Sequence, residues 1–399
     1  MRLAPLPLLL LAVLTLVGCG ATPTRPGMDQ PAATGGPGRL SGDYAGYPAA
    51  RQFIDRMAAE HGFDRDELAR TLSRAQRQDW IVDLVNRPTG GPATGPTGAW
   101  TRYRAKFVTD SNIAAGAAFW ARNEATLRRA EAQYGVPPEA VVGILGVETR
   151  WGGYMGKTRI IDALTTLAFD FPRRSAYFTG ELESYLIMAR DEGMDPFRPV
   201  GSYAGAMGLG QFMPSSYLKY AVDFDGDGHR NLWDTEDAIG SVANYFAAHG
   251  WRRGELVAVP AQNRGGEGAI LKAGFDTRYS PSALRTKGIS PAGPVPAVEE
   301  VSLLRLDAAG GYEYWLGLPN FYTITRYNHS TYYAMAVHQL GQAIRARRAS
   351  ATLAGGVAPG SGVRATGGHS LAWVGKDDAG PAPGVSVSTA KYGPLLSRR

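Results

Sequence analysis

The sequence predicts a mainly α-helical protein that carries a small β element in its second half. Apolar side chains recur at helical spacing over residues 51–85, 112–134, 158–193 and 332–345. Two other stretches alternate apolar and polar residues, as is typical of strands: residues 255–259 and 300–306. The second is followed by the turn sequence AAGG and then by residues 312–318, which predicts a hairpin.

The N-terminus has the pattern of an export signal. Arg2 precedes an apolar run at residues 8–17, which is too short to span a bilayer, and Gly18 and Cys19 follow it. Residues 16–19 resemble the lipobox of bacterial lipoproteins, which implies that Cys19, the only cysteine, is lipidated. Gly20 rather than Asp at the next position implies the outer membrane, with the protein facing the periplasm. An ordinary signal peptide at residues 1–19 stays open as the alternative.

Composition divides the rest of the chain into three parts. Much of the excess of the 51 Gly and 26 Pro lies near the two ends. Residues 20–50 are therefore predicted to be a flexible tether, and residues 349–399 a disordered tail. The chain between them, residues 51–348, has the 3.6-residue periodicity and apolar content of one folded domain.

The positive charge does not indicate nucleic acid binding. The formal net charge is +6, but the basic residues are scattered, apart from the pairs at 128–129, 173–174 and 252–253. With an export signal in place, nucleic acid is excluded as a partner. The anionic polymer that an exported protein meets in a periplasm is peptidoglycan, and it is the expected partner.

One stretch combines a nearly apolar helix with a single carboxylate near its end. Residues 136–153 read VPPEAVVGILGVETRWGG, with prolines where a helix begins and glycines where it ends. A helix that is apolar on nearly all sides is buried on nearly all sides, so Glu148 is predicted to be partly desolvated. Desolvation raises the pKa of a carboxyl group, as a general acid requires. An ion pair between Glu148 and Arg150 stays open as the alternative.

Residues 223–237 contain a calcium-binding pattern. The sequence DFDGDGHRN fits the start of an EF-hand loop, in which carboxylates at positions one, three and five and a carbonyl at position seven hold the ion. These ligands are Asp223, Asp225, Asp227 and the carbonyl of His229. Position twelve is Asp234 instead of glutamate, and Asp237 can close the site from the next helix. One structural calcium ion is expected, with an Asp- and Gly-rich turn as the alternative.

Four motifs in this order resemble those of the membrane-bound lytic murein transglycosylases: GVETRWG, GAMGLGQFMPSSY, DFDGDGHRNLWD and NFYTITRYNHSTYY. The resemblance covers about residues 51–346 and leaves out the C-terminal tail. It implies a lipoprotein with a lysozyme-like core and additional helices, and cell-wall turnover as its role. It also implies cleavage of the β-1,4 bond between N-acetylmuramic acid and N-acetylglucosamine without water, which forms 1,6-anhydromuramic acid ends.

The resemblance assigns roles to individual residues. Glu148 would be the sole catalytic group, first as an acid and then as a base. In this family the calcium loop closes at the later aspartate, which implies Asp237 as a ligand. The implied saccharide-binding residues are Tyr103, Ser202, Gln211, Tyr245, Tyr327, Asn328 and Tyr333. Arg173 and Arg174 would hold the carboxylates of the stem peptide, with a helix-capping role as the alternative.

Two rival functions stay open. A hydrolytic muramidase on the same scaffold would need a second catalytic carboxylate, and Asp162 and Asp170 lie at ordinary helical spacings. A calcium-stabilised wall-binding lipoprotein without activity would not need Glu148. For the enzyme we expect a monomer that uses no organic cofactor and that can associate with cell-wall synthesis proteins.

Overall fold

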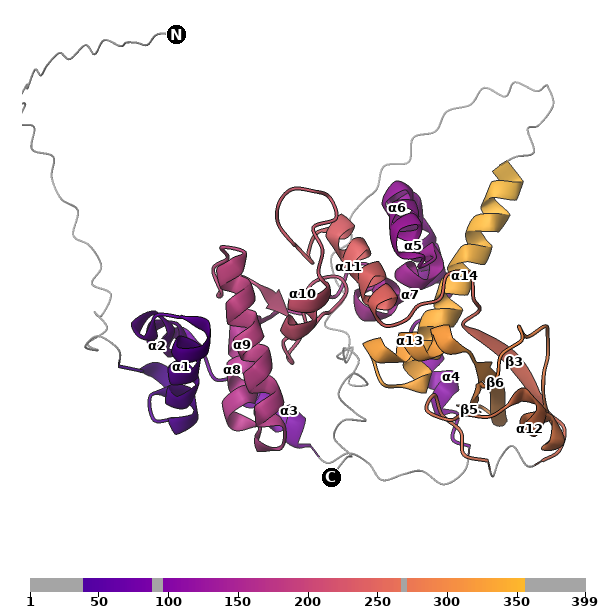
Figure 1. Cartoon of the computed structure of the whole chain (residues 1–399), viewed down its shortest axis with the longest axis horizontal. Helices are drawn as coiled ribbons and strands as arrows, with labels where there is room; N and C mark the ends of the chain where they lie inside the picture. The colour runs from indigo at the N-terminus through magenta and orange to yellow at the C-terminus, as the bar shows by residue number, and fades with distance from the viewer. Residues whose placement is uncertain (1–38, 88–95, 267–270, 356–399) are drawn as a thin grey trace, which may run out of the picture.

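The molecule is elongated, with helices at one end and a four-stranded sheet at the other (Figure 1). It was analysed as a computed structural model, which describes residues 39–87, 96–266 and 271–355. The predicted signal segment with Cys19 and nearly all of the predicted tail lie outside these residues. No helix within the described ranges is both long and apolar enough to cross a membrane.

The N-terminal end is built from short helices. They are η1 (Gly42–Tyr44), α1 (Pro48–His61), α2 (Arg65–Arg74) and α3 (Asp79–Asn86). Helix α1 begins at a proline and stops at Gly62, whose φ of 67° only glycine adopts readily. The prediction that a tether extends to residue 50 is wrong, because Tyr44 is fully buried and its ring packs edge-on against Phe169. A single buried aromatic residue in a Gly- and Pro-rich stretch is enough to fix this segment to the core.

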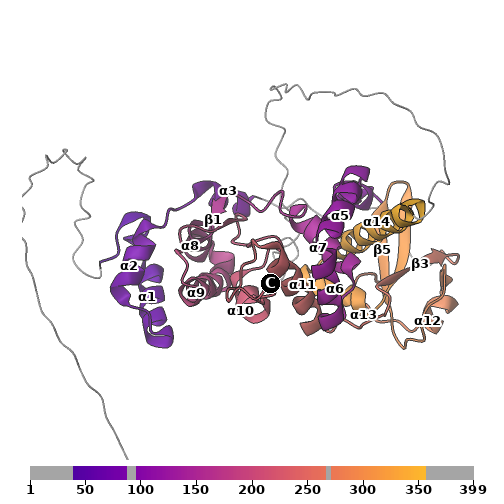
Figure 2. The same ribbon diagram turned by 90° about the horizontal axis from the view of Figure 1, so that it is seen from above.

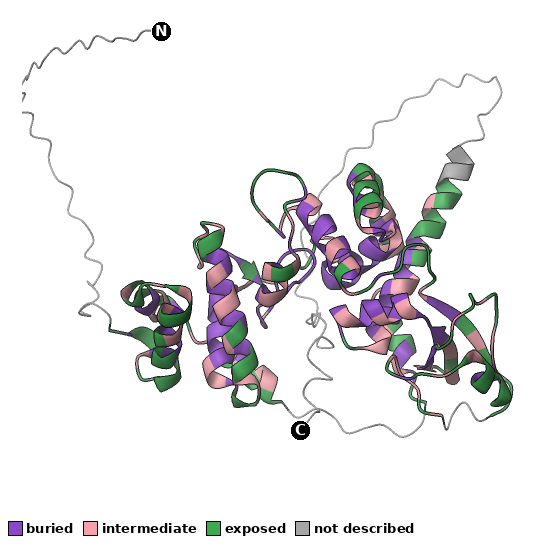
Figure 3. Cartoon of the chain, viewed as in Figure 1, coloured by how far each residue is buried: buried purple, intermediate pink, exposed green. Residues whose placement is uncertain are grey.

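The next layer is an antiparallel helix pair, with short elements around it. They are β1 (Thr158–Arg159), α8 (Ile160–Asp170), η2 (Pro172–Arg174), α9 (Ser175–Asp191), β2 (Val200–Gly201) and α10 (Pro214–Tyr220). Pro172 ends α8 because a proline cannot continue the helical hydrogen bonding. Figure 3 shows that buried residues continue from α8 and α9 into the helices at the centre of the molecule.

The centre of the molecule is organised around one helix, α7 (Pro138–Thr149). It is surrounded by α5 (Asp110–Arg122), α6 (Glu124–Tyr134), α11 (Thr235–Ala248), α13 (Pro319–Tyr327) and α14 (Thr331–Gly355), with α4 (Ala99–Arg104) nearby. All residues of α7 except Glu139 are buried, as the apolar sequence predicted. Glycines allow α7 and α14 to approach closely: a Cβ on Gly143 would lie 2.6 Å from the carbonyl oxygen of Val337.

Two predicted helix bounds are wrong. The single helix expected over residues 112–134 is two helices, α5 and α6, which meet at Asn123 with φ −113° and ψ 23°. Asn123 donates from its side chain to the carbonyl of Phe119, and this local bond competes with continuation of the helix. At the other end, α14 continues to Gly355, beyond the predicted start of the tail at residue 349.

The sheet is antiparallel and has the strand order β4-β3-β6-β5. Its strands are β3 (Ala258–Asn263), β4 (Ile289–Pro291), β5 (Ser302–Ala308) and β6 (Gly311–Gly317), and α12 (Pro281–Thr286) precedes β4. Leu303 pairs with Leu316 on one face, which has its own small core, whereas Leu304 pairs with Trp315 on the face toward the helices. Seen from above, the sheet lies beside α14 (Figure 2). The predicted hairpin and β element are confirmed, although β3 begins three residues later than expected.

Candidate active site

Glu148 lies at the C-terminal end of α7, and only 8% of it is exposed. Its Oε1 accepts a hydrogen bond of 2.5 Å from the hydroxyl of Tyr333, on α14. Arg150, the partner in the alternative ion pair, instead places its guanidinium group over the ring of Tyr154, 5.1 Å from the ring centroid. The carboxyl group is therefore held within the core by a neutral donor.

The chain turns sharply directly after Glu148. Arg150 and Trp151 both have left-handed backbone conformations, with φ of 50° and 56°, which are costly for residues with side chains. The indole N–H of Trp151 donates to the carbonyl of Val142 and fixes this turn against α7. Thr149 donates from its hydroxyl to the carbonyl of Leu209 at 2.9 Å. The end of the helix is thus bonded to the glycine-rich loop that begins after β2.

Two tyrosines surround the carboxyl group of Glu148. Burial, followed by the negative charge of Glu148, raises the pKa of Tyr327 and of Tyr333 well above the usual value for a phenol. Both hydroxyls therefore act as hydrogen-bond donors. Tyr333 donates to Glu148, and Tyr327 donates to the carbonyl of Gly210 at 2.5 Å.

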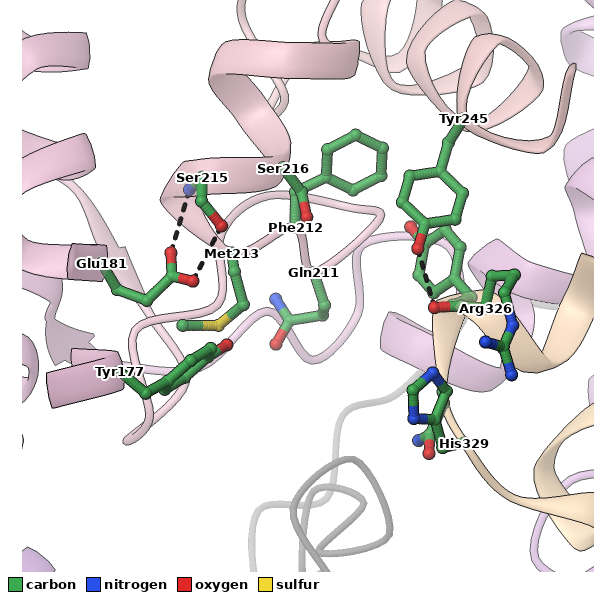
Figure 4. A pocket seen from close by; sticks show the side chains of 12 residues that line it. Tyr177, Glu181, Gln211, Phe212, Met213, Ser215, Ser216, Tyr245, Arg326 and His329 are labelled. Atoms are coloured by element: carbon green, nitrogen blue, oxygen red, sulfur yellow. Dashed lines mark hydrogen bonds between the residues drawn. The ribbon is translucent and has the colours of Figure 1, made fainter. Parts of the chain in front are cut away.

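Tyr327 also lines a cavity of about 200 Å³, which lies between α9, α10, α11 and the turn after α13. Gln211 lies between the side formed by Tyr177 and Glu181 and the side formed by Tyr245 and Arg326 (Figure 4). The lining mixes aromatic rings with amide and hydroxyl groups. Such a surface suits a sugar, which needs stacking partners for its faces and hydrogen bonds for its hydroxyl and acetamido groups.

The glycine-rich loop contains two of the predicted saccharide-binding residues, and only one of them reaches the cavity. Gln211 has φ 51°, and its amide nitrogen donates to the carbonyls of Met155 and Gly208, at 3.2 Å and 2.9 Å. Ser202 is 4% exposed, and its hydroxyl oxygen accepts from the amides of Ala204 and Ala206. Gln211 thus reaches the cavity, whereas Ser202 shapes the loop from within.

Tyr245 and Asn328 lie on the opposite side of the cavity from Glu181. The hydroxyl of Tyr245 donates to the carbonyl of Arg326 at 2.8 Å, and its ring stacks on His249. Asn328 is 3% exposed, and neither its amide nitrogen nor its oxygen has a hydrogen-bond partner within the described residues. A buried amide with both groups unsatisfied is costly, and a ligand in the cavity can satisfy it.

The remaining predicted binding residues come from other elements. Tyr103, on α4, stacks on Trp100 and packs against Tyr332, which precedes Tyr333 on α14. Arg173 donates to the carbonyl of Val85 and thereby links η2 to α3. Arg174 lies 4.1 Å from the ring centroid of Tyr177 and so stays next to the cavity.

Glu181 is a cavity residue that sequence analysis missed. Its two oxygens accept from the amide and the hydroxyl of Ser215, at 2.9 Å and 2.8 Å, and so cap the start of α10 (Figure 4). The helical spacing of α9 gave no sign that this side chain turns toward the cavity. Asp162 and Asp170 were considered above as the second carboxylate that a hydrolase would need, and both have structural partners. Asp162 binds Arg159 and the amide of Gln76, and Asp170 binds Arg77.

The acidic loop brings together the carboxylates that a cation needs. The side-chain oxygens of Asp223, Asp225 and Asp227 all lie within 4.8 Å of one another and are exposed. The carboxylate of Asp223 accepts from the amides of Gly226 and Gly228 and so folds the loop around itself. The pKa of Asp225 is raised above its usual value. The hydrogen bond from the amide of Asp227 lowers this pKa, but desolvation and the negative charges of Asp237 and Asp227 raise it by more. The donor set fits a hard cation such as calcium.

The closing aspartates have separate roles. Asp234 caps α11 by accepting from the amides of Glu236 and Asp237. Asp237 is buried and accepts from the amides of Phe224 and Asn231, so it fixes both ends of the loop. A carboxylate oxygen of Asp234 and one of Asp237 each lie within 4.8 Å of a carboxylate oxygen of Asp225. The amide of His229 donates to Asp227.

We expect the Tyr333→Phe variant to lose about 10- to 100-fold in kcat with little change in KM. The ring keeps its packing, but Glu148 loses a hydrogen bond of the kind that is worth about 1.5–3 kcal/mol when one partner is charged. Steady-state kinetics on purified peptidoglycan measure this. Tyr185→Phe is the matched control, because it removes a buried tyrosine hydroxyl on α9 that donates to the carbonyl of Pro196. An unchanged kcat in Tyr333→Phe would contradict the role of this hydroxyl.

Known proteins resemble this chain over most of its length. The family model described as "Transglycosylase SLT domain" matches residues 46–342. The membrane-bound lytic murein transglycosylase B of Escherichia coli (strain K12) is 59% identical over 314 residues, which are 78% of this chain and 86% of that protein.

Solved structures agree over the same region. The lytic transglycosylase Slt35 of Escherichia coli in complex with calcium is 56% identical, with a TM-score of 0.74, over 81% of this chain and 100% of that one. The complex of Slt35 with bulgecin A is 57% identical, with the same TM-score and coverage. The family model covers far more than half of the chain. The chain therefore belongs to the transglycosylase SLT domain family.

Proposed function

We propose that Glu148 is the sole acid and base of this peptidoglycan lytic transglycosylase. Protonated Glu148 gives its proton to the glycosidic oxygen, and the acetamido oxygen of the muramoyl residue bonds to C1 as the leaving sugar departs. The Glu148 carboxylate then takes the proton of the C6 hydroxyl. O6 bonds to C1, the acetamido group is released, and the anhydro product forms while Glu148 regains its proton.

The observation that supports this most directly is the setting of Glu148. The group is buried at the end of an apolar helix, and Tyr333 donates a hydrogen bond to its Oε1. Exclusion of water favours the intramolecular attack of O6 over hydrolysis. Glu181, which lines the neighbouring cavity, is engaged by Ser215 and has no proton-transfer role in this mechanism.

The mass of the products tests the proposal. Peptidoglycan digested with the protein that lacks residues 1–19 should give muropeptides one water lighter than muramidase products. Products that carry this water would identify a hydrolase and would direct attention to Glu181. An absence of products would favour the wall-binding alternative.

For binding, we propose that Gln211, Tyr245, Tyr327 and Asn328 hold the saccharide. Gln211, Tyr245 and Tyr327 each donate a hydrogen bond to a backbone carbonyl. These bonds fix the positions of the three side chains before substrate arrives. Asn328 supplies a buried amide that the described residues leave unsatisfied. The other three predicted residues, Tyr103, Ser202 and Tyr333, position the site and do not contact the saccharide. Arg174 is better placed than Arg173 to meet a stem-peptide carboxylate, because it lies against Tyr177.

We also propose that Cys19 carries the lipid that holds the enzyme at the outer membrane, facing the periplasm. The E. coli relative is a membrane-bound enzyme, and no helix in the described part of this chain can span a bilayer. Attachment through acyl chains reconciles these two facts. Metabolic labelling with a palmitate analogue should mark the parent chain and leave Cys19→Ala unmarked.

We propose that the acidic loop holds one calcium ion with a structural role, by analogy with the calcium complex of Slt35. The ligands are Asp223, Asp225 and Asp227, the carbonyl of His229, and Asp237. The ion supplies the positive charge that lets three exposed carboxylates remain within 4.8 Å of one another. It takes no part in bond cleavage.

Removal of calcium is expected to lower the Tm by about 5–10 °C. Saturating ligand at about a hundred times its Kd contributes about 2.7 kcal/mol, and a domain of this size loses about 2–4 °C per kcal/mol. Thermal unfolding with calcium and with a chelator measures this. Asp225→Asn should abolish the difference, whereas Asp64→Asn, at the N-cap of α2, should keep it. A parent chain that melts at the same temperature in both conditions would refute calcium stabilisation.

A further inference from the structure

A second, larger cavity lies at the other end of the catalytic helix. It has a volume of about 910 Å³ and lies between the start of α7, the middle of α14, and the segment that leads from α11 into β3. Glu139 on its wall and Glu148 in the active site belong to the same helix, nine residues apart. At 1.5 Å per residue, the two sites are separated by about 14 Å along the axis.

This cavity continues over the edge of the sheet. A neighbouring cavity of about 410 Å³ is lined by Tyr312 and Tyr314, and the two cavities share Pro260 and Trp315. Pro260 and Trp315 are paired across β3 and β6. The two cavities therefore adjoin at Pro260 and Trp315 and form an extended track, which suits a chain of linked rings better than a compact ligand.

The larger cavity contains a buried donor without a partner. Trp251 is 9% exposed, and its indole N–H makes no hydrogen bond with any described residue. Its ring is held by Phe246, with ring centroids 5.3 Å apart. An unsatisfied buried N–H is costly, so a carbonyl or hydroxyl oxygen of a ligand would stabilise this site.

The charges of the cavity walls cancel. Four arginines and four glutamates line it: Arg128, Arg253, Arg345, Arg348, Glu124, Glu131, Glu139 and Glu255. Arg345 pairs with Glu139 at 2.8 Å, and Arg348 pairs with Glu124 at 3.2 Å. His338 adds no charge near neutral pH, since burial lowers its pKa to about 4. The walls thus favour a neutral ligand with many hydrogen-bonding groups over a peptide that carries carboxylates.

We propose that this track is a second glycan-binding site, which takes a neutral strand of N-acetylated sugars outside the catalytic groove. A pyranose face stacks on Trp315, and an acetamido carbonyl accepts from the indole N–H of Trp251. This site goes beyond the catalytic assignment, and its test does not depend on turnover.

Calorimetric titration of the full chain in detergent, in the Glu148→Gln background, tests the proposal. The probe is the tetramer of N-acetylglucosamine, which that variant does not cleave. Two binding events per chain are expected. Trp315→Ala should remove one event and leave the other unchanged. Trp251→Phe keeps a ring but removes the N–H, and should weaken that same event by about fivefold, the effect of one neutral hydrogen bond.

Phe63→Ala is the matched control, because it removes a half-buried ring at the opposite end of the molecule, where Arg190 packs on it. It should keep both events. Retention of the groove event and of the Tm shows that each variant is folded. A single event in the parent, or two events in Trp315→Ala, would overturn the proposal.

Discussion

Glu148→Gln should reduce peptidoglycan cleavage by about a thousandfold or more. Proton transfer by a positioned acid is worth roughly 10²–10⁴-fold, and here one group serves in both steps. Glutamine has nearly the same shape and its carbonyl oxygen can still accept from the hydroxyl of Tyr333. Binding of glycan should therefore be preserved while turnover is lost. Muropeptide release and glycan affinity, measured on the same preparation, check both expectations.

Two further glutamates make this test specific. Glu183→Gln removes a carboxylate that pairs with Arg56 and His61 at the far end of the molecule, and should leave turnover unchanged. Glu181→Gln changes the carboxylate that lines the neighbouring cavity and should cost less than about tenfold, because the amide can still accept from Ser215. Retained turnover in Glu148→Gln would refute the assignment of the acid. A loss in Glu181→Gln as large as that in Glu148→Gln would favour a two-carboxylate hydrolase.

Gly341→Ala should lower the free energy of unfolding by about 2–3 kcal/mol and reduce activity with it. A Cβ at this position would lie 2.2 Å from the backbone carbonyl oxygen of Glu139, which cannot move without shifting α7. Overpacking of this kind typically costs about 1–3 kcal/mol. Because α7 carries Glu148 and α14 carries Tyr333, separation of the helices lengthens their hydrogen bond. Chemical denaturation and kcat measure the two effects.

Gly180→Ala provides the comparison. This glycine lies within α9, and a Cβ there would meet nothing within 4 Å. Alanine should stabilise the helix by up to about 1 kcal/mol, because glycine is the poorer helix former. Equal stability of the Gly341→Ala and parent chains would show that the two helices can separate without cost.

The sequence was sufficient to predict the fold class and its central helix. The mainly α, lysozyme-like class is confirmed by the solved structures that resemble this chain. The apolar residues of α7 also predicted correctly that this helix has no exposed face. The ends of the folded region were predicted less well. Tyr44 is buried through contacts with Phe169, which is distant in sequence, and no local pattern announces such a contact.

The site was predictable where a single motif supplied its residues. Glu148 followed from its apolar helix, and the aspartates of the acidic loop followed from their spacing. Glu181 was not predictable, because its role depends on the position of Ser215 on another helix. The large cavity behind α7 was missed for the same reason, since its walls come from five separate segments of the chain.

The contact between Tyr333 and Glu148 joins residues 185 positions apart. Tyr327 and Gly210, which are 117 positions apart, close the neighbouring contact. Contacts that are so distant in sequence form late in folding, because the loops they close must be ordered first. During synthesis, the carboxyl group of Glu148 therefore gains its tyrosine partner only after the chain has been made as far as α14.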